Sequence, residues 1–80
     1  MIEVEVKLFA TLRRQYPDLK VGEAMSMELP EDATVARLVK ELGLPEEEVK
    51  VVFVNGTIRK KDYGLTDGDA VGIFPPVGGG

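Results

Sequence analysis

The residues best suited to chemistry in this chain form its C-terminal end, Pro75-Pro76-Val77-Gly78-Gly79-Gly80. Proline fixes the backbone and gives no N–H to a sheet, so this segment is expected to leave the fold as a stiff, extended tail. Glycines pack no core and lose much entropy on ordering, but they are thin enough to enter a channel. The reactive group would be the α-carboxylate of Gly80, which is ionised at neutral pH, and Gly79 would be required for access. The alternative is a frayed terminus without a role.

The rest of the chain lacks the side chains on which self-contained enzymes commonly depend. Its 80 residues include no cysteine and no histidine, so a thiolate metal site is excluded and the usual general base is missing. We therefore expect no intrinsically bound cofactor or metal. Any nucleophile or proton-transfer group must come from partner proteins, and whether the chain counts as an enzyme depends on them.

Composition places the chain among small globular proteins of one domain. Hydrophobic residues make up 44% of the sequence, charged residues make up 30%, and the net charge is −4. This negative charge argues against nucleic-acid binding and permits association with basic partner surfaces. No apolar run approaches the ~20 residues that a membrane span needs. We expect a cytoplasmic protein with neither nucleic acid nor membrane as a partner.

Two segments near the N-terminus alternate as half-buried strands do. Residues 2–9 form the first, whose buried face would carry Ile2, Val4, Val6 and Leu8. Phe9 falls on the opposite face, where the other side chains are charged. Residues 25–29 form the second strand, closed by Pro30, and residues 10–16 between the two strands could form a helical turn.

A helix is predicted from Thr34 to about Gly43. The Thr34 hydroxyl can cap the first turn by accepting a hydrogen bond from a free backbone N–H. One apolar stripe follows at helical spacing and contains Val35, Leu38, Val39 and Leu42. Gly43 suits the left-handed residue that ends many helices, and Pro45 prevents continuation.

Three strands are predicted in the second half of the chain. Residues 49–54 are apolar apart from Lys50, which suits a strand covered on both faces or central in the sheet. Asn55-Gly56 predicts a type I′ hairpin leading to a short strand at 57–58, because that turn needs positive φ at both positions. Asp67-Gly68-Asp69 forms a second turn before the last strand, residues 70–74.

Two charged runs lie between these elements. Glu46–Glu48 offers three adjacent carboxylates, which suggest metal binding, but a solvated loop or short turn is the better interpretation. Arg59–Lys61 offers three cations, which suggest phosphate binding, but a solvated loop is again the better interpretation.

The predicted order is strand, strand, helix, strand, strand, strand. One helix can cover only one face of a sheet, so we predict an α+β roll in which a mixed five-stranded sheet carries one main helix on one face. This is the order of the β-grasp, or ubiquitin-like, fold. The domain would span residues 1–74, and residues 75–80 would form an extended, flexible C-terminal tail.

The segment Leu65–Val77 reads LTDGDAVGIFPPV. It closely resembles the C-terminal signature of the ThiS/MoaD family of ubiquitin-like sulfur carriers, approximately L-x-D-G-D-x-V-x-[FI]-F-P-P-V-x-G-G, and within that family the small subunit of molybdopterin synthase. The match has no gap here and extends more loosely over the whole chain. Gly78 departs from the pattern, since relatives more often carry alanine, threonine or serine there. The resemblance implies that the first and last strands are parallel neighbours at the centre of the sheet, with the C-terminus leaving at one edge.

The resemblance also implies a series of reactions at Gly80. A ubiquitin-activating-type adenylyltransferase, similar to MoeB or ThiF, would bind the domain and use ATP and Mg²⁺ to adenylate the carboxylate. A persulfide sulfur donor would then displace AMP and leave a C-terminal thiocarboxylate. The large subunit of molybdopterin synthase, similar to MoaE, would receive the loaded tail. The sulfur would pass to a cyclic pyranopterin precursor and build the dithiolene that holds molybdenum or tungsten.

Strand parity predicts a partner-binding surface on the helix-free face. If Val71 and Ile73 face the helix, Phe74 faces outward beside Phe9, and Ile58 could extend the group. Exposed apolar patches on small domains usually mark partner sites, and the resemblance implies docking of the activating enzyme and the large subunit here. The same partners would hold the next residues, Pro75, Pro76, Val77 and Gly78. The alternative is a loop that folds over the phenylalanines.

Three functions are compatible with these observations. The favoured one is the sulfur carrier of molybdopterin synthase, because of the Phe-Pro-Pro-Val segment and the long first connection. The second is another sulfur carrier of the same fold, for thiazole, cysteine or methionine synthesis, or a protein modifier conjugated to lysines through Gly80. The third is a β-grasp binding module with an inert tail. Mass spectrometry of the purified chain would distinguish a carrier by its thiocarboxylate.

Overall fold

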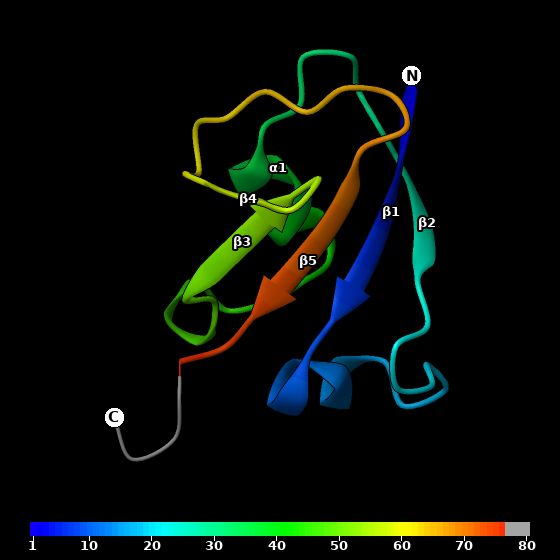
Figure 1. The fold of residues 1–80 in the computed structure, drawn as a ribbon, viewed down its shortest axis with the longest axis vertical. Helices are drawn as coiled ribbons and strands as arrows, with labels where there is room; N and C mark the ends of the chain where they lie inside the picture. Colours follow the sequence, from blue (N-terminus) through cyan, green and yellow to red (C-terminus); the bar gives the residue numbers. More distant parts are fainter. Residues whose placement is uncertain (77–80) are drawn as a thin grey trace.

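A five-stranded mixed sheet forms the body of the protein in the computed structural model, which describes residues 1–76 (Figure 1). The strands are β1 (Ile2–Leu8), β2 (Met25–Leu29), β3 (Val51–Val54), β4 (Thr57–Arg59) and β5 (Ala70–Phe74). Their order across the sheet is β2-β1-β5-β3-β4. β1 and β5 are parallel and the other pairs are antiparallel, so the predicted β-grasp order and the central parallel pair are confirmed.

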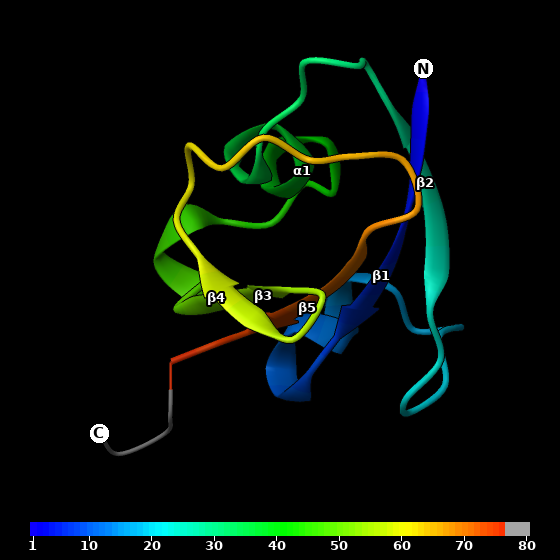
Figure 2. The same ribbon diagram turned by 45° about the horizontal axis from the view of Figure 1, so that its top comes forward.

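Alternation along β1 decides which face of the sheet is buried. Its residues are buried and exposed in strict turn, and the buried ones are Ile2, Val4, Val6 and Leu8. Val71 and Ile73 of β5 are buried on the same side. Figure 2 shows that α1 (Val35–Glu41) lies on this face of the sheet and not on the opposite one. The opposite face of the central strands is therefore left for other contacts.

Helix α1 has the start, stripe and end that the sequence predicts. The Thr34 hydroxyl accepts a hydrogen bond from the Arg37 N–H at 3.3 Å, and Gly43 after the helix has a φ of +74°. The stripe residues are all buried, namely Val35, Leu38, Val39 and Leu42. Within residues 1–76, no helix is long and apolar enough to cross a membrane.

The loop between β4 and β5 crosses the start of α1. The Val35 N–H donates to the Tyr63 carbonyl at 3.0 Å, and the Ala36 N–H donates to the Lys61 carbonyl at 2.9 Å. Neither N–H group has a partner within the helix, because no helical carbonyl lies one turn before the first residues of a helix. The loop therefore satisfies the helix terminus and is held in place over it.

Two predicted boundaries are wrong. β1 ends at Leu8 and not at Phe9, because the chain turns there into a 3-10 helix, η1 (Ala10–Gln15), which buries Leu12. β3 begins at Val51 and not at Val49, because Glu46–Glu48 forms a second 3-10 turn, η2. β3 lies inside the sheet, between β5 and β4, as one of the two alternatives predicted; its residues alternate between half-buried and buried, so it is fully covered on one face only. The Asn55-Gly56 turn is confirmed, with φ values of 52° and 85°.

Candidate functional site

The turn before β5 fixes where that strand begins. The Glu3 N–H of β1 donates to a carboxylate oxygen of Asp67 at 2.8 Å, and the Gly68 N–H donates back to the Glu3 carbonyl at 2.8 Å. Gly68 has a φ of +88°, which glycine adopts without strain. The turn is thereby bonded to β1 from both directions.

The carboxylate of Asp69 joins the same turn to the β3–β4 hairpin. Asp69 is only 7% exposed, and its two oxygens accept hydrogen bonds from the Thr66 N–H at 2.8 Å and the Asn55 side-chain amide at 2.9 Å. The Asn55 side-chain oxygen in turn accepts from the Ala70 N–H at 2.9 Å. A buried carboxylate is stable only when its acceptor sites are used in this way. The network sets the register of β5 and therefore the position of Phe74, its last residue.

Phe9 and Phe74 stack on the helix-free face, as strand parity predicted. Their ring centroids lie 4.1 Å apart and their planes differ by 3°. The Phe9 N–H donates to the Ile73 carbonyl at 3.1 Å, which continues the β1–β5 pairing past the end of β1. Both rings are half-buried, because each covers part of the other.

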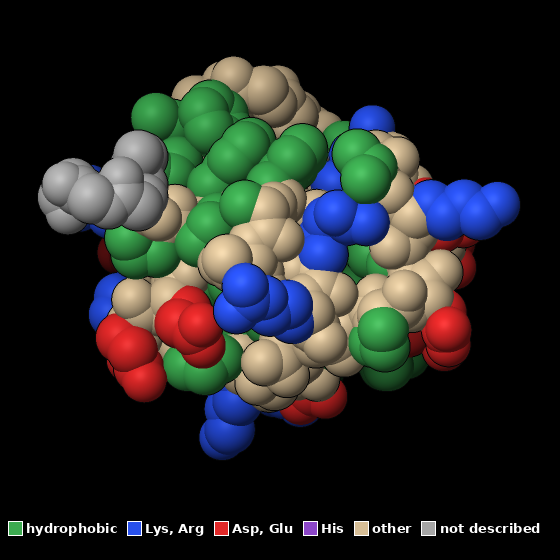
Figure 3. All heavy atoms as spheres, turned by 90° about the horizontal axis from the view of Figure 1, so that it is seen from below, with side chains coloured by type: hydrophobic (Ala, Val, Ile, Leu, Met, Phe, Trp, Pro, Cys, Tyr) green, Lys and Arg blue, Asp and Glu red, His purple; other side chains and the backbone are tan. Residues whose placement is uncertain are grey.

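Phe53 completes this surface, although strand parity was not applied to it in the sequence. Its ring meets that of Phe74 edge to face, with centroids 5.4 Å apart. Ile58 pairs with Phe53 across β3 and β4 and is 61% exposed, so Phe53 lies between Ile58 and the stacked pair. The four residues, which we call the aromatic surface, are Phe9, Phe53, Ile58 and Phe74. Figure 3 shows hydrophobic side chains gathered at the end of the molecule where β1 and β5 finish.

Gly72 makes room for the stacked rings. It lies on the outer face of β5, opposite Lys7 of β1 and Phe53 of β3. A Cβ atom added there would lie 3.3 Å from Cε2 of Phe9 and 3.6 Å from Cε1 of Phe74. Glycine inside a strand often marks such a close approach. The flat packing of Phe9 therefore depends on the absence of a side chain at this position.

The tail leaves the sheet directly beside the aromatic surface. Pro75 is half-buried and Pro76 is exposed, and neither belongs to a strand. The predicted tail residues Val77, Gly78, Gly79 and Gly80 lie outside the described residues. Within residues 1–76, no three histidine, cysteine, aspartate or glutamate side chains cluster so that they could hold a metal ion. The described part of the site is an apolar surface beside the residues at which the C-terminal segment leaves β5.

Comparison with known proteins agrees with this geometry. The model of the ThiS family matches residues 6–80, nearly the whole chain. The chain belongs to the ThiS family. It is a ubiquitin-like protein of the ThiS/MoaD type, whose members are sulfur carriers or modifiers.

Among ThiS-family relatives, small archaeal modifier protein 3 of Haloferax volcanii is 33% identical over 93 aligned positions that include 99% of this chain and 100% of that protein. A solved structure from Pyrococcus furiosus, described as a proposed molybdopterin converting factor subunit 1, is 35% identical with a TM-score of 0.77 and covers 96% of this chain and 100% of that one. A chain from the complex of subunits 1 and 2 of the Helicobacter pylori molybdopterin-converting factor is 24% identical, has a TM-score of 0.62 and covers 99% and 100%. This last likeness shows the shared fold.

Proposed function

We propose that the chain is the sulfur-carrying small subunit of a molybdopterin synthase. The observation that carries this proposal is the position of the aromatic surface, directly beside the point where the tail leaves β5. A partner that covers Phe9, Phe53 and Phe74 would find the tail at its own surface. The proposed identity of the Pyrococcus furiosus relative supports the choice of this pathway.

The proposed chemistry begins at the Gly80 carboxylate. Bound to an activating enzyme with ATP and Mg²⁺, a carboxylate oxygen attacks the α-phosphorus, and pyrophosphate leaves. A persulfide sulfur of a donor protein then attacks the acyl carbon and expels AMP. A second thiol cleaves the resulting acyl disulfide and leaves the C-terminal thiocarboxylate. The large synthase subunit would finally accept the loaded tail and direct its sulfur to a pyranopterin precursor.

The chain itself contributes position and reach to these steps. From Pro75 to Gly80 the tail spans at most about 20 Å, so the carboxylate can enter a neighbouring active site while the domain stays outside. The hydrogen bonds of Asp69 fix the register of β5 and therefore the position at which the tail begins. We assign the proton transfers to the partners, because the chain lacks histidine, the residue that most often serves as general acid or base.

Deletion of Gly80 tests the assignment of the reactive group. Deletion moves the carboxylate back by ~3.3 Å, and a misplacement of only ~1 Å can cost on the order of 100-fold in rate. ATP–pyrophosphate exchange with the activating enzyme should therefore collapse, while the melting temperature stays unchanged. Gly79→Val should act similarly by blocking the channel, and Gly78→Ala is the matched control that should exchange normally. Exchange at the parent rate after deletion would refute the proposal.

A second function, protein modification, is favoured by the likeness to small archaeal modifier protein 3. The same acyl adenylate could be attacked by a lysine amine of another protein, with AMP as the leaving group and an amide as the product. Incubation of the chain with the activating enzyme and ATP distinguishes the two outcomes. A sulfur carrier gains the mass of one oxygen-to-sulfur exchange when a persulfide donor is supplied, and it converts the pyranopterin precursor. A modifier forms covalent adducts with proteins through their lysines, and thiols do not cleave these adducts because the bond is an amide.

A further inference from the structure

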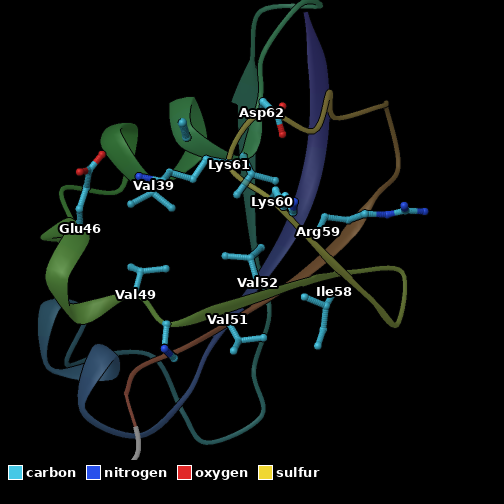
Figure 4. A pocket seen from close by; sticks show the side chains of 13 residues that line it. Val39, Glu46, Val49, Val51, Val52, Ile58, Arg59, Lys60, Lys61 and Asp62 are labelled. Atoms are coloured by element: carbon cyan, nitrogen blue, oxygen red, sulfur yellow. The ribbon is translucent and has the colours of Figure 1, made fainter.

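A groove of about 570 Å³ lies between α1, β3 and the chain that follows β4 (Figure 4). In Figure 4 the side chain of Val39 extends from α1, and those of Val49 and Val52 extend toward the same space from the other side. Helix α1 is only seven residues long, and beyond it Val39, Val52 and the half-buried Val49 form the floor of the groove, with Val39 and Val52 7% and 6% exposed. A volume of this size lies in the range of known binding pockets.

The groove is basic although the protein is acidic. Its lining includes four cations against Glu46 and Asp62, and these cations are Lys50, Arg59, Lys60 and Lys61. The whole chain has a net charge of −4. Within residues 1–76, the salt bridges are Met1–Glu31 and Arg37–Glu41, so no carboxylate of that part of the chain forms a salt bridge with a groove cation. Arg59 stacks on Tyr63 at 4.5 Å, which leaves the three lysines for an occupant.

The groove is continuous with the aromatic surface. Ile58 lines the groove and also pairs with Phe53 of that surface. Val51, half-buried on the outer face of β3, lines the groove as well. The groove and the aromatic surface therefore adjoin at the edge of the sheet, at Ile58.

We propose that this groove binds an extended segment of a partner protein in which bulky aliphatic side chains are flanked by carboxylates. The aliphatic groups would cover Val39, Val49 and Val52, and the carboxylates would meet Lys50, Lys60 and Lys61. The segment would belong to a protein that docks on the aromatic surface, so the identity of its source rests on the proposed function. Binding of the segment itself needs only the isolated domain. A failure of the segment to bind the groove can therefore be distinguished from a failure of sulfur transfer, which needs the partner proteins.

The test uses a short synthetic peptide of leucines flanked by glutamates, with blocked ends and a fluorescent label. Its affinity for the full chain is measured by anisotropy, and its position by backbone amide shifts in NMR spectra. We expect the shifts to fall on α1, η2 and the residues after β4. Double substitution Lys60→Glu with Lys61→Glu should weaken binding by about tenfold, and higher salt should weaken binding to the parent chain. Lys20→Glu, at an exposed position outside the groove lining, is the matched control and should bind as the parent does.

Ala36→Phe tests the apolar part of the groove. Ala36 is exposed and lines the groove, so a phenyl ring there should fill the groove and abolish binding without a change in melting temperature. A peptide with alanines in place of leucines should also fail to bind. Equal affinity of the alanine peptide, no measurable binding of the leucine peptide, or amide shifts confined to the aromatic surface would each overturn the proposal.

Discussion

Gly72 shows at the scale of one residue how the aromatic surface is built. Substitution Gly72→Val should not weaken the strand, because β-branched residues suit strands, but its methyl groups would displace the Phe9 ring, which already lies 3.3 Å from a Cβ position. We expect the ring-current shifts of Phe9 and Phe74 to disappear from NMR spectra, with little change in melting temperature. Gly64→Val is the control, since a Cβ there meets nothing within 4 Å. Unchanged Phe9 shifts in Gly72→Val would contradict this account of Gly72.

Asp69 is the second residue on which the site depends. Substitution Asp69→Ala leaves the Thr66 N–H and the Asn55 amide without acceptors in a place that is 7% exposed. An unsatisfied buried donor costs about 1–3 kcal/mol, so the free energy of unfolding in urea should fall by about 2–3 kcal/mol. Asp67→Ala removes a single exposed hydrogen bond, and we expect a loss of about 1 kcal/mol or less there. Equal losses in the two variants would show that the buried network has no special role.

At the scale of the element, α1 holds the sheet through one fully buried residue. Leu38 has 0% exposure, and Leu38→Ala should lower the free energy of unfolding by about 2–5 kcal/mol, because it removes buried methyl groups and leaves a cavity. Lys40→Ala on the exposed side of the same helix should change it by no more than about 0.5 kcal/mol. Chemical denaturation of both variants measures the difference. A loss under 1 kcal/mol in Leu38→Ala would mean that the helix packs loosely.

Elements with a clear pattern could be predicted from the sequence, and boundaries could not. Strict alternation in β1, the helical stripe of α1 and the Asn55-Gly56 turn each have one reading, and each is confirmed. The start of β3 had no such signal, because Val49 and Val51 are equally apolar, and Val49 is the residue that ends the η2 turn and not the first residue of the strand. Phe53 was missed for the same reason, since an unbroken apolar run conceals which residues face outward. The groove beside α1 could not be predicted, because it depends on how far a short helix extends over the sheet, and no local sequence pattern indicates that extent.

At the scale of the whole molecule, the aromatic surface should affect association more than folding. Phe74 contacts both Phe9 and Phe53 and is half-buried in the isolated chain. Phe74→Glu would place a carboxylate at the centre of the proposed interface, so calorimetric affinity for the large subunit should fall by at least tenfold, or about 1.4 kcal/mol. The loss in unfolding free energy should be smaller. Val21→Glu alters another exposed apolar residue, 81% exposed, and should bind normally. Undiminished affinity of Phe74→Glu would exclude this face as the interface.

The central position of β5 has a mechanical consequence. This strand is bonded on one side to β1 and on the other to β3, and the chain continues from its last residue into the tail. If a partner drew the tail inward, as the proposed function requires, the tension would run along the strand axis and load both ladders in shear. The hydrogen bonds of the ladders then share the force, whereas at a hairpin pulled open from its end they would break one after another. Under the proposed function, the domain should therefore stay folded each time a partner pulls on the C-terminus.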